Sequence, residues 1–194
     1  MRSLLLKISR SLFRWPPEPS SPATKHALVA RFARTVPNLV ETGTFEGDMV
    51  EAQRENYSRI VSIELADALC AAAQKRFAPY PHITILHGDS GQVLPEALRL
   101  LKGPAAFWLD GHYSGGVTAG GNADPPILRE LAMIAARQEL QDAILIDDAR
   151  LFGWRRGYPP LTTVREFAVR NWPHHKFQVE SDVICIVPKQ PAAA

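Results

Sequence analysis

The chain has 194 residues, of which 46% are hydrophobic, and a formal net charge of +2 at pH 7. This length and composition suit a single domain with a substantial core. No run of about 18 apolar residues occurs, so the sequence contains no candidate for an apolar membrane-spanning helix. Cys70 and Cys185 are too few for a disulfide framework, and we expect both to be buried, reduced thiols.

The basic residues are unevenly distributed. The first 14 residues lack acids and hold four basic side chains, Arg2, Lys7, Arg10 and Arg14, whereas the rest of the chain holds 18 basic and 20 acidic ones. The main part is therefore not basic, which argues against nucleic acid as a partner. We expect residues 1–15 to form a basic amphipathic helix that contacts a membrane surface, a dimer mate or its own domain. Because this segment lacks the features of a signal peptide, we expect a cytoplasmic protein.

Secondary-structure signals divide the remainder of the chain. A proline-rich linker at 16–22 precedes the main domain, predicted over 23–188, and a tail follows at 189–194. The domain opens with a predicted helix at 23–35. Short apolar runs then predict strands at 38–42, 60–64, 83–87, 106–110 and 143–147. Helical stretches alternate with them at 47–56, 67–77, 93–101, 126–137 and 161–171.

The pattern of these elements predicts the fold class. The apolar runs lack strict alternation, which is typical of strands buried on both faces of a parallel sheet. Alternating strands and helices predict an α/β fold, a three-layer α/β/α sandwich with right-handed crossovers. The last two apolar segments, 177–179 and 183–187, flank the turn-like Glu180-Ser181-Asp182 and predict a terminal antiparallel hairpin. We therefore expect a mostly parallel, seven-stranded sheet.

Each of the first five predicted strands ends on a carboxylate or an acid-rich turn. These acids are Glu41, Glu64, Asp89, Asp110 and the pair Asp147-Asp148. In open α/β sheets, ligands bind in the crevice at the carboxyl ends of the strands. We therefore expect this row of acids to line a binding site.

The loop after the first strand, Glu41 to Gly47, indicates the kind of ligand. Gly43 and Gly47 permit a tight turn and a close start of the following helix. A dinucleotide site would need a G-x-G-x-x-G loop, and here acidic Glu46 and Asp48 lie where a pyrophosphate would bind. A cationic ligand without phosphate, such as S-adenosylmethionine (SAM), fits better, because Glu41 favours its positive amino-acid end.

Two further acids extend this cofactor half of the site. Glu64 can accept hydrogen bonds from a ribose diol, as acids at this position do in dinucleotide folds. Asp89, with Ser90 beside it, can contact the adenine amino group. The alternative is that these residues only cap the helices that follow, since Asp and Ser are good N-caps.

A resemblance joins these motifs. The E-x-G-x-x-x-G of residues 41–47, the acid that ends the second strand and Gly88-Asp89-Ser90 resemble the SAM-binding region of class I SAM-dependent methyltransferases, over roughly residues 36–188. The terminal hairpin is also typical of that Rossmann-like fold. The resemblance implies a SAM site made of Glu41, Gly43, Thr44, Gly47, Glu64, Asp89, Ser90 and Asp110.

The acids after the fourth and fifth strands form a second group. Asp110, Asp147 and Asp148 would repel each other unless they were protonated or bound to a cation, and Mg²⁺ accepts such oxygen ligands. The layout is similar to metal-dependent O-methyltransferases of the catechol type and of the macrolide-sugar and aminocoumarin-sugar type. This resemblance implies that Asp110, Asp147 and Asp148 hold the metal. Catechol enzymes place a Lys shortly after the first acid, where this chain has His112 and Tyr113. We expect His112 to act as the base alongside Asp110, with a loop-orienting role as the alternative.

Together these features predict a SAM-dependent methyltransferase that acts on a hydroxyl of a small molecule or glycan with help from Mg²⁺. The glycine-rich segment 114–124 is expected to be a substrate lid. Arg150, Trp154, Arg155, Arg156 and Tyr158 either recognise an anionic or sugar substrate or form an exposed basic loop. The alternatives are a nucleic-acid methyltransferase and a catalytically silent SAM-binding partner protein. A phosphatase-like hydrolase would need its nucleophile where this chain has Glu41.

Overall fold

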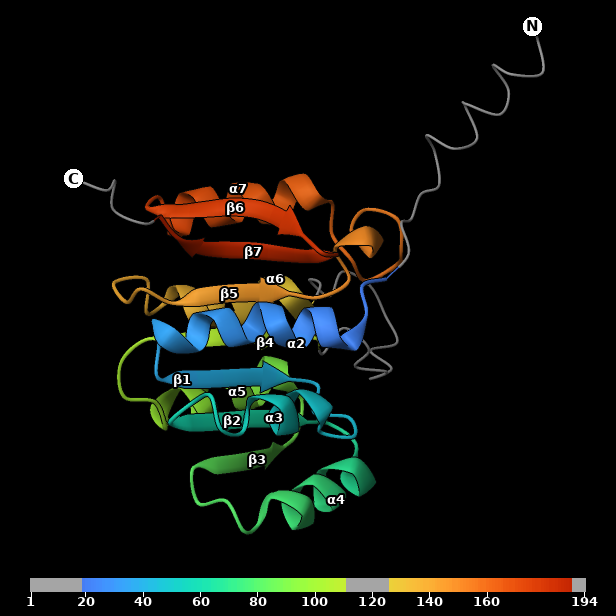
Figure 1. The fold of residues 1–194 in the computed structure, drawn as a ribbon. Coiled ribbons are helices and arrows are strands. Elements are labelled where there is room, and N and C mark those ends of the chain that lie inside the picture. Colours follow the sequence, from blue (N-terminus) through green and yellow to red (C-terminus); the bar gives the residue numbers. More distant parts are fainter. Residues whose placement is uncertain (1–18, 111–125, 190–194) are drawn as a thin grey trace, which may run out of the picture.

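A seven-stranded sheet forms the centre of the molecule in the computed structural model, which describes residues 19–110 and 126–189 (Figure 1). The strand order is β3-β2-β1-β4-β5-β7-β6. The parallel strands are β1 (Asn38–Thr42), β2 (Arg59–Glu64), β3 (Ile83–His87), β4 (Ala105–Leu109) and β5 (Ala143–Ile146). The last two strands, β6 (His175–Glu180) and β7 (Val183–Pro188), form an antiparallel hairpin whose β7 pairs with β5. The predicted fold class and terminal hairpin are thereby confirmed.

Helices cover both faces of this sheet (Figure 1). One face carries α2 (Pro22–Ala30), α3 (Asp48–Gln53) and α4 (Asp67–Phe77). The other face carries α5 (Ser90–Arg99), α6 (Pro126–Ala135) and α7 (Leu161–Asn171). Two short 3₁₀ helices are also present: η1 (Arg31–Arg34) extends α2, and η2 (Ala149–Leu151) follows β5. The result is the predicted three-layer sandwich.

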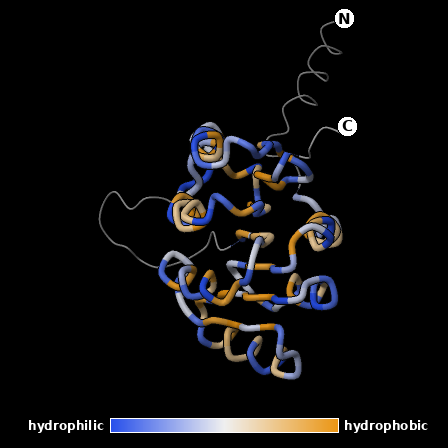
Figure 2. Tube along the Cα trace, turned by 90° about the vertical axis from the view of Figure 1, so that its left-hand side faces the viewer, coloured by the Kyte–Doolittle hydropathy of each residue, from blue (hydrophilic) through white to orange (hydrophobic). Residues whose placement is uncertain are grey.

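The core lies in two layers, one on each face of the sheet. Leu39 and Ile60 pack toward α2, α3 and α4, whereas their neighbours Val40 and Val61 pack toward α5, α6 and α7. Figure 2 shows hydrophobic stretches along the strands in the interior. Because the central strands are buried on both faces, their sequences read as continuous apolar runs rather than alternating ones.

Helix caps explain where the predicted boundaries differ from the observed ones. The bounds predicted for β1, α4, β3 and α7 match those observed. In contrast, α5 begins at Ser90 rather than at residue 93, because the Asp89 side chain caps it by accepting a hydrogen bond from Gly91 N at 2.9 Å. The helix predicted at 23–35 is instead α2 followed by η1, and Ser21 caps α2.

Several predictions concern segments that the structure does not describe. The leader at 1–15, residues 16–18 of the linker, His112, the glycine-rich segment and residues 190–194 of the tail lie outside the described residues. Within the described residues, no helix combines the length and apolar character needed to cross a membrane. Cys70 and Cys185 are both free and buried, as predicted.

Candidate active site

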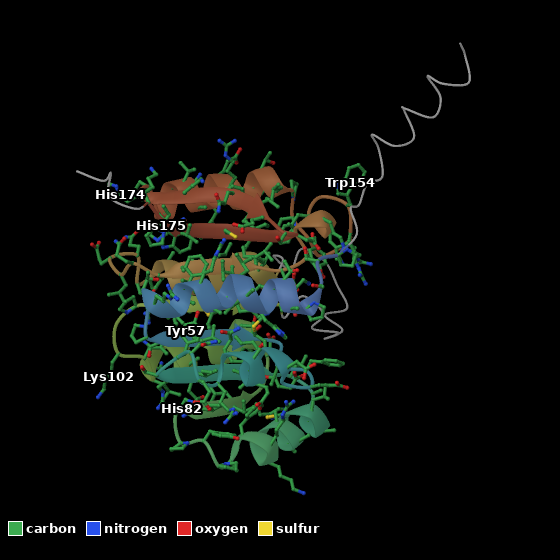
Figure 3. The ribbon with its side chains drawn as sticks, viewed as in Figure 1. Tyr57, His82, Lys102, Trp154, His174 and His175 are labelled. Atoms are coloured by element: carbon green, nitrogen blue, oxygen red, sulfur yellow. The ribbon has the colours of Figure 1, made fainter. Side chains whose placement is uncertain are left out.

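The strand-end acids lie along one edge of the sheet because β1 to β5 are parallel. Their carboxyl ends point to the right in Figure 1, and Trp154, labelled in Figure 3, lies on that side of the molecule. In sheet order, the acids at or just after the carboxyl ends of these strands are Asp89, Glu64, Glu41, Asp110 and Asp147. Topology thus brings together residues that are far apart in the chain, as the sequence predicted.

The glycine loop after β1 is held close to β2 and α4. Gly43 has a φ of +88° and donates its N–H to the Ile63 carbonyl at 2.9 Å. Gly47, at a φ of +84°, precedes α3, and a Cβ atom built there would lie 2.7 Å from Cε2 of Phe77. Both positions therefore require glycine, for backbone conformation at each and for space at Gly47.

Glu41, at the end of β1, has a buried carboxyl group. Ser62 donates its hydroxyl to Oε2 of Glu41 at 2.5 Å, and Thr44 lies 2.6 Å from that same Ser62 oxygen. Because the single Ser62 proton is already used, Thr44 is the donor to Ser62. Burial, reinforced by the negative charges of Asp110 and Glu64, raises the pKa of Glu41 to about 8. A cationic ligand at this position would favour the ionised form.

Glu64 ties the glycine loop to the start of α4. Its Oε2 accepts a hydrogen bond from Phe45 N at 2.7 Å, and its Oε1 accepts one from Ala66 N at 2.9 Å. Each carboxylate oxygen has a second lone pair, so a ribose diol can still bind. Glu64 therefore shapes the loop whether or not it also contacts a ligand.

Ser90 leads to an acid that sequence reasoning missed. Its hydroxyl donates to Oε1 of Glu130 on α6 at 2.5 Å, and Thr42 also hydrogen bonds to this carboxyl group. Glu130 is 2% exposed. Burial, with a contribution from the charge of Asp89, raises its pKa to about 7 despite these hydrogen bonds. The signal was a single acid within the apolar face of a helix, two residues after Leu128 and one before Leu131.

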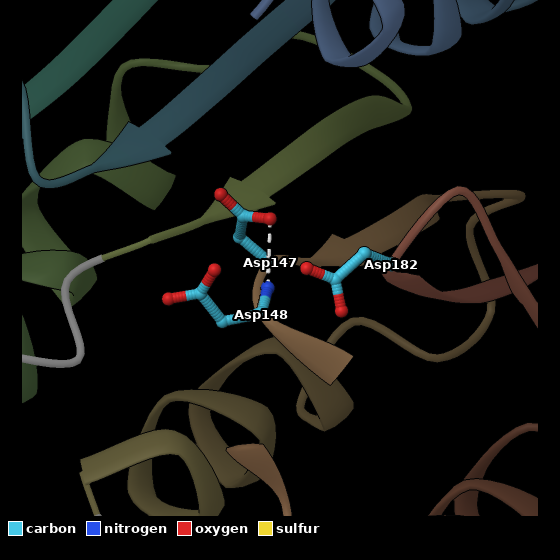
Figure 4. A group of neighbouring side chains, drawn as sticks. All are labelled: Asp147, Asp148 and Asp182. Atoms are coloured by element: carbon cyan, nitrogen blue, oxygen red, sulfur yellow. Dashed lines mark hydrogen bonds between the residues drawn. The ribbon is translucent and has the colours of Figure 1, made fainter. Parts of the chain in front are cut away.

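The acceptor half contains a close group of three carboxylates. Asp147, Asp148 and Asp182 each place an oxygen so that all three atoms lie within 4.8 Å of one another (Figure 4). Asp148 has a φ of +58° and donates its N–H to Oδ1 of Asp147 at 2.7 Å. Asp182 comes from the turn between β6 and β7, and the sequence had indicated only a turn there.

Asp110 is the residue directly after β4. Loss of hydration and the negative charges of Asp147 and Asp148 raise the pKa of Asp110 to about 8, while Lys25 opposes the rise. The structure therefore brings the predicted set Asp110, Asp147 and Asp148 into electrostatic contact.

Two cations already pair with these acids. Lys25 on α2 donates to Oδ2 of Asp147 at 2.6 Å and lies 3.8 Å from Oδ1 of Asp148. Arg150 donates to Oδ1 of Asp148 at 2.6 Å and also to Asp182. Burial raises the pKa of Asp147, and the bond from Lys25 opposes that rise.

Oxygen ligands from three carboxylates suit a hard divalent ion in principle. Here, however, each of those carboxylates is paired with a lysine or an arginine. Lys25 and Arg150 thus supply positive charge to this group of carboxylates. The predicted Mg²⁺ site, with Asp110 in place of Asp182, stays a prediction.

In the loop after β5, Arg150 is bound to other residues of the protein, whereas Trp154 is exposed. Arg150 is engaged by two aspartates and is only partly exposed, so it stabilises the junction of β5 and β7. Trp154 is 72% exposed and remains the aromatic side chain of this loop that is most accessible to a substrate among the described residues.

A cavity of about 1150 Å³ lies at the opposite end of the sheet, between η1 and the β6–β7 hairpin. His174 and His175 mark that end in Figure 3. The residues that line this cavity include none of the strand-end acids. We place the site at the carboxyl edge, where the topology of an open α/β sheet puts ligands, rather than in this cavity.

Comparisons with known proteins concern the fold. No protein-family model matches the sequence, and no curated protein matches it. Solved structures do match in fold. TomG from Streptomyces achromogenes, an O-methyltransferase involved in tomaymycin synthesis and solved with SAM, is 16% identical, with a TM-score of 0.61 over 89% of this chain and 83% of that one. The SAH-bound methyltransferase PaMTH1 from Podospora anserina is 17% identical, with a TM-score of 0.59 over 88% and 80%.

The N-methyltransferase NodS from Bradyrhizobium japonicum is 12% identical, with a TM-score of 0.55 over 87% of this chain and 96% of that one. At these identities the likeness establishes the fold and not the acceptor. The chain has the fold of the class I SAM-dependent methyltransferases.

Proposed function

We propose that the chain is a SAM-dependent methyltransferase that methylates a hydroxyl group of a small molecule or sugar. The observation that carries this proposal is Glu41, a buried carboxyl group at the end of β1 whose charged neighbours are themselves acids. A buried acid in that setting favours a cationic ligand, and the tight glycine loop beside it brings backbone close to such a ligand. The two methyltransferases solved with SAM or SAH share this fold, which supports the same interpretation.

Each residue of the cofactor half has a distinct task in this proposal. When bound, SAM supplies an electrophilic methyl group on a positively charged sulfur. Glu41 holds the ammonium end, Glu64 accepts from the ribose hydroxyls, and Asp89 with Ser90 contacts the adenine. Glu130 keeps Ser90 oriented through its hydrogen bond. These groups fix the methyl donor so that the acceptor oxygen can approach in line.

The acceptor half removes a proton. The acceptor hydroxyl loses its proton to His112 or to Asp110 as its oxygen forms the bond to the methyl carbon, and the carbon–sulfur bond breaks toward sulfur. The sulfur becomes neutral, which removes the favourable interaction with nearby acids and promotes product release. Lys25 and Arg150 pair with Asp147 and Asp148, two of the three carboxylates predicted to hold a metal.

Calorimetry with SAM tests the cofactor assignment. We expect the wild-type protein to bind SAM and Glu41→Ala to bind it at least about tenfold more weakly, since a charge-assisted contact is lost. Glu46→Ala, a change to an exposed acid in the same loop, is the matched control and should leave the affinity unchanged. Absence of SAM binding to the wild-type protein would refute the proposal.

Transfer of a labelled methyl group tests the acceptor class. Hydroxylated small molecules, sugars and RNA are incubated separately with the protein and labelled SAM. We expect a labelled product from a small molecule or sugar, and mild base should not release the label from it. Label incorporated only into RNA would favour the nucleic-acid alternative, and binding without transfer to any acceptor would favour a catalytically silent partner.

A further inference from the structure

Lys25 lies among acids that are far from it in the sequence. Its Nζ donates to Oδ2 of Asp147 at 2.6 Å and lies 3.8 Å from Oδ1 of Asp148. The Lys25 side chain is 16% exposed and that of Asp147 is 4% exposed. This contact is therefore shielded from water, unlike the surface ion pairs that contribute little.

The helix that carries Lys25 holds it in this position. Lys25, Leu28 and Val29 lie on the same face of α2, at the spacing of three and four residues that places side chains side by side. Leu28 and Val29 are buried against the sheet, so α2 cannot rotate without exposing them. Lys25 also lies near the start of α2, where the helix dipole disfavours a cation, and Asp147 offsets that cost.

A lysine in this position competes directly with a divalent ion. Mg²⁺ needs oxygen ligands at about 2.0–2.1 Å, whereas an oxygen of Asp147 is already bonded to an ammonium group. Arg150 binds the two other carboxylates of the group in the same way. A divalent ion would have to displace Lys25 and then remain next to it, with repulsion between like charges at close range.

We propose that Lys25 takes the place of a divalent metal in the acceptor half, an inference that rests on the proposed methyltransferase function. Lys25 is a positioning residue: its ammonium holds Asp147, and through Asp147 the backbone of Asp148, in one arrangement beside Asp110. The acceptor is accordingly a hydroxyl compound that needs no bidentate metal chelation, and a single hydroxyl is sufficient for binding.

A Mn²⁺ titration of chelator-treated protein, followed by electron paramagnetic resonance, tests this role without using activity. The wild-type protein should show no saturable binding below about 1 mM Mn²⁺, the weak end of protein cation sites. Lys25→Met should gain Mn²⁺ binding at least about tenfold tighter, because the carboxylates lose their ammonium partner. Lys25→Arg should behave like the wild-type protein. Lys75→Met, which changes an exposed lysine on α4, is the matched control and should gain nothing.

SAM binding in the same samples separates the two proposals. The wild-type affinity for SAM should agree within about twofold between Mg²⁺ and EDTA, given the usual precision of such comparisons. Saturable micromolar Mn²⁺ binding to the wild-type protein that Asp147→Asn abolishes would overturn the role of Lys25, and so would a folded Lys25→Met variant that gains no binding. Circular dichroism checks folding, and if Lys25→Met does not fold, the wild-type titration alone decides. Failure to bind SAM in either buffer would remove the proposed function, while the Mn²⁺ result would still stand.

Discussion

Replacing Glu130 by glutamine should stabilise the protein in a pH-dependent way. The Glu130 carboxyl group is almost fully buried, accepts the Ser90 hydroxyl and has a pKa raised to about 7. A glutamine keeps the same shape and an oxygen that accepts from Ser90, but it carries no charge at any pH. The variant therefore removes the cost of ionising a buried group while it retains the local contact.

The magnitude follows from the difference in pKa between the folded and unfolded chain. The pKa rises from an ordinary value of 4.5 to about 7, and each pH unit of such a shift corresponds to about 1.4 kcal/mol. The folded protein holds the Glu130 proton more tightly than the unfolded chain does. The contribution of this proton to stability is therefore complete below pH 4.5 and is lost as the pH rises to about 7. The change in the free energy of unfolding caused by Glu130→Gln should therefore be about 3 kcal/mol more favourable at pH 8 than at pH 4.5.

Urea unfolding at pH 4.5 and at pH 8 measures this difference. Glu96→Gln, at an exposed position on α5, serves as the control and should show the same small effect at both values. An equal effect of Glu130→Gln at the two pH values would show that the folded protein does not hold the Glu130 proton. Burial would then not raise the pKa of Glu130 in the folded protein.

Three further changes test the loop, the acceptor half and the cofactor site. Gly47→Ala should lower the stability measured by thermal unfolding by about 1–3 kcal/mol, because φ is positive there and the new methyl group would press against the Phe77 ring of α4. Gly157→Ala, with a similar φ but open space around it, should lower the stability less, and equal losses would show that packing against Phe77 does not matter. Arg150→Met should lower the stability measured by urea unfolding by about 3 kcal/mol, because Asp148 and Asp182 lose their partner. The control Arg156→Met, at an exposed position, should change the stability by less than about 0.5 kcal/mol, and equal losses in the two variants would refute the importance of the Arg150 ion pairs. Wild-type affinity for SAM, measured by calorimetry, should rise about tenfold per pH unit up to pH 8 as Glu41 ionises, and a slope that persists in Glu41→Gln would disprove its origin.

The fold was largely predictable because its signals are local. The apolar runs marked each strand, and the turn-like residues 180–182 marked the final hairpin. Boundaries were less certain where a cap competes with the hydrophobic pattern. Asp89 starts α5 three residues before the first strongly apolar position that the prediction used.

The site was only partly predictable because two of its charges come from distant elements. The strand-end acids follow from strand order, and parallel pairing places them together. Lys25 contacts Asp147 across 122 residues of sequence, and Asp182 comes from the turn of the antiparallel hairpin. Sequence spacing does not encode such contacts. A signal was present in each case: a cation on the apolar face of α2, and an acid in the turn next to β5.

The position of β7 between β5 and β6 has a consequence for the order in which the protein can fold during synthesis. The chain emerges from the ribosome with its amino-terminal end first. Every residue of the cofactor half has been made once synthesis reaches Glu130. Lys25 can form its contact only after Asp147 has been made. The contacts of Arg150 with Asp182 form later still, because Asp182 is made only with the hairpin. All residues of the cofactor half are therefore present in the nascent chain while the acceptor half still lacks one of its charges.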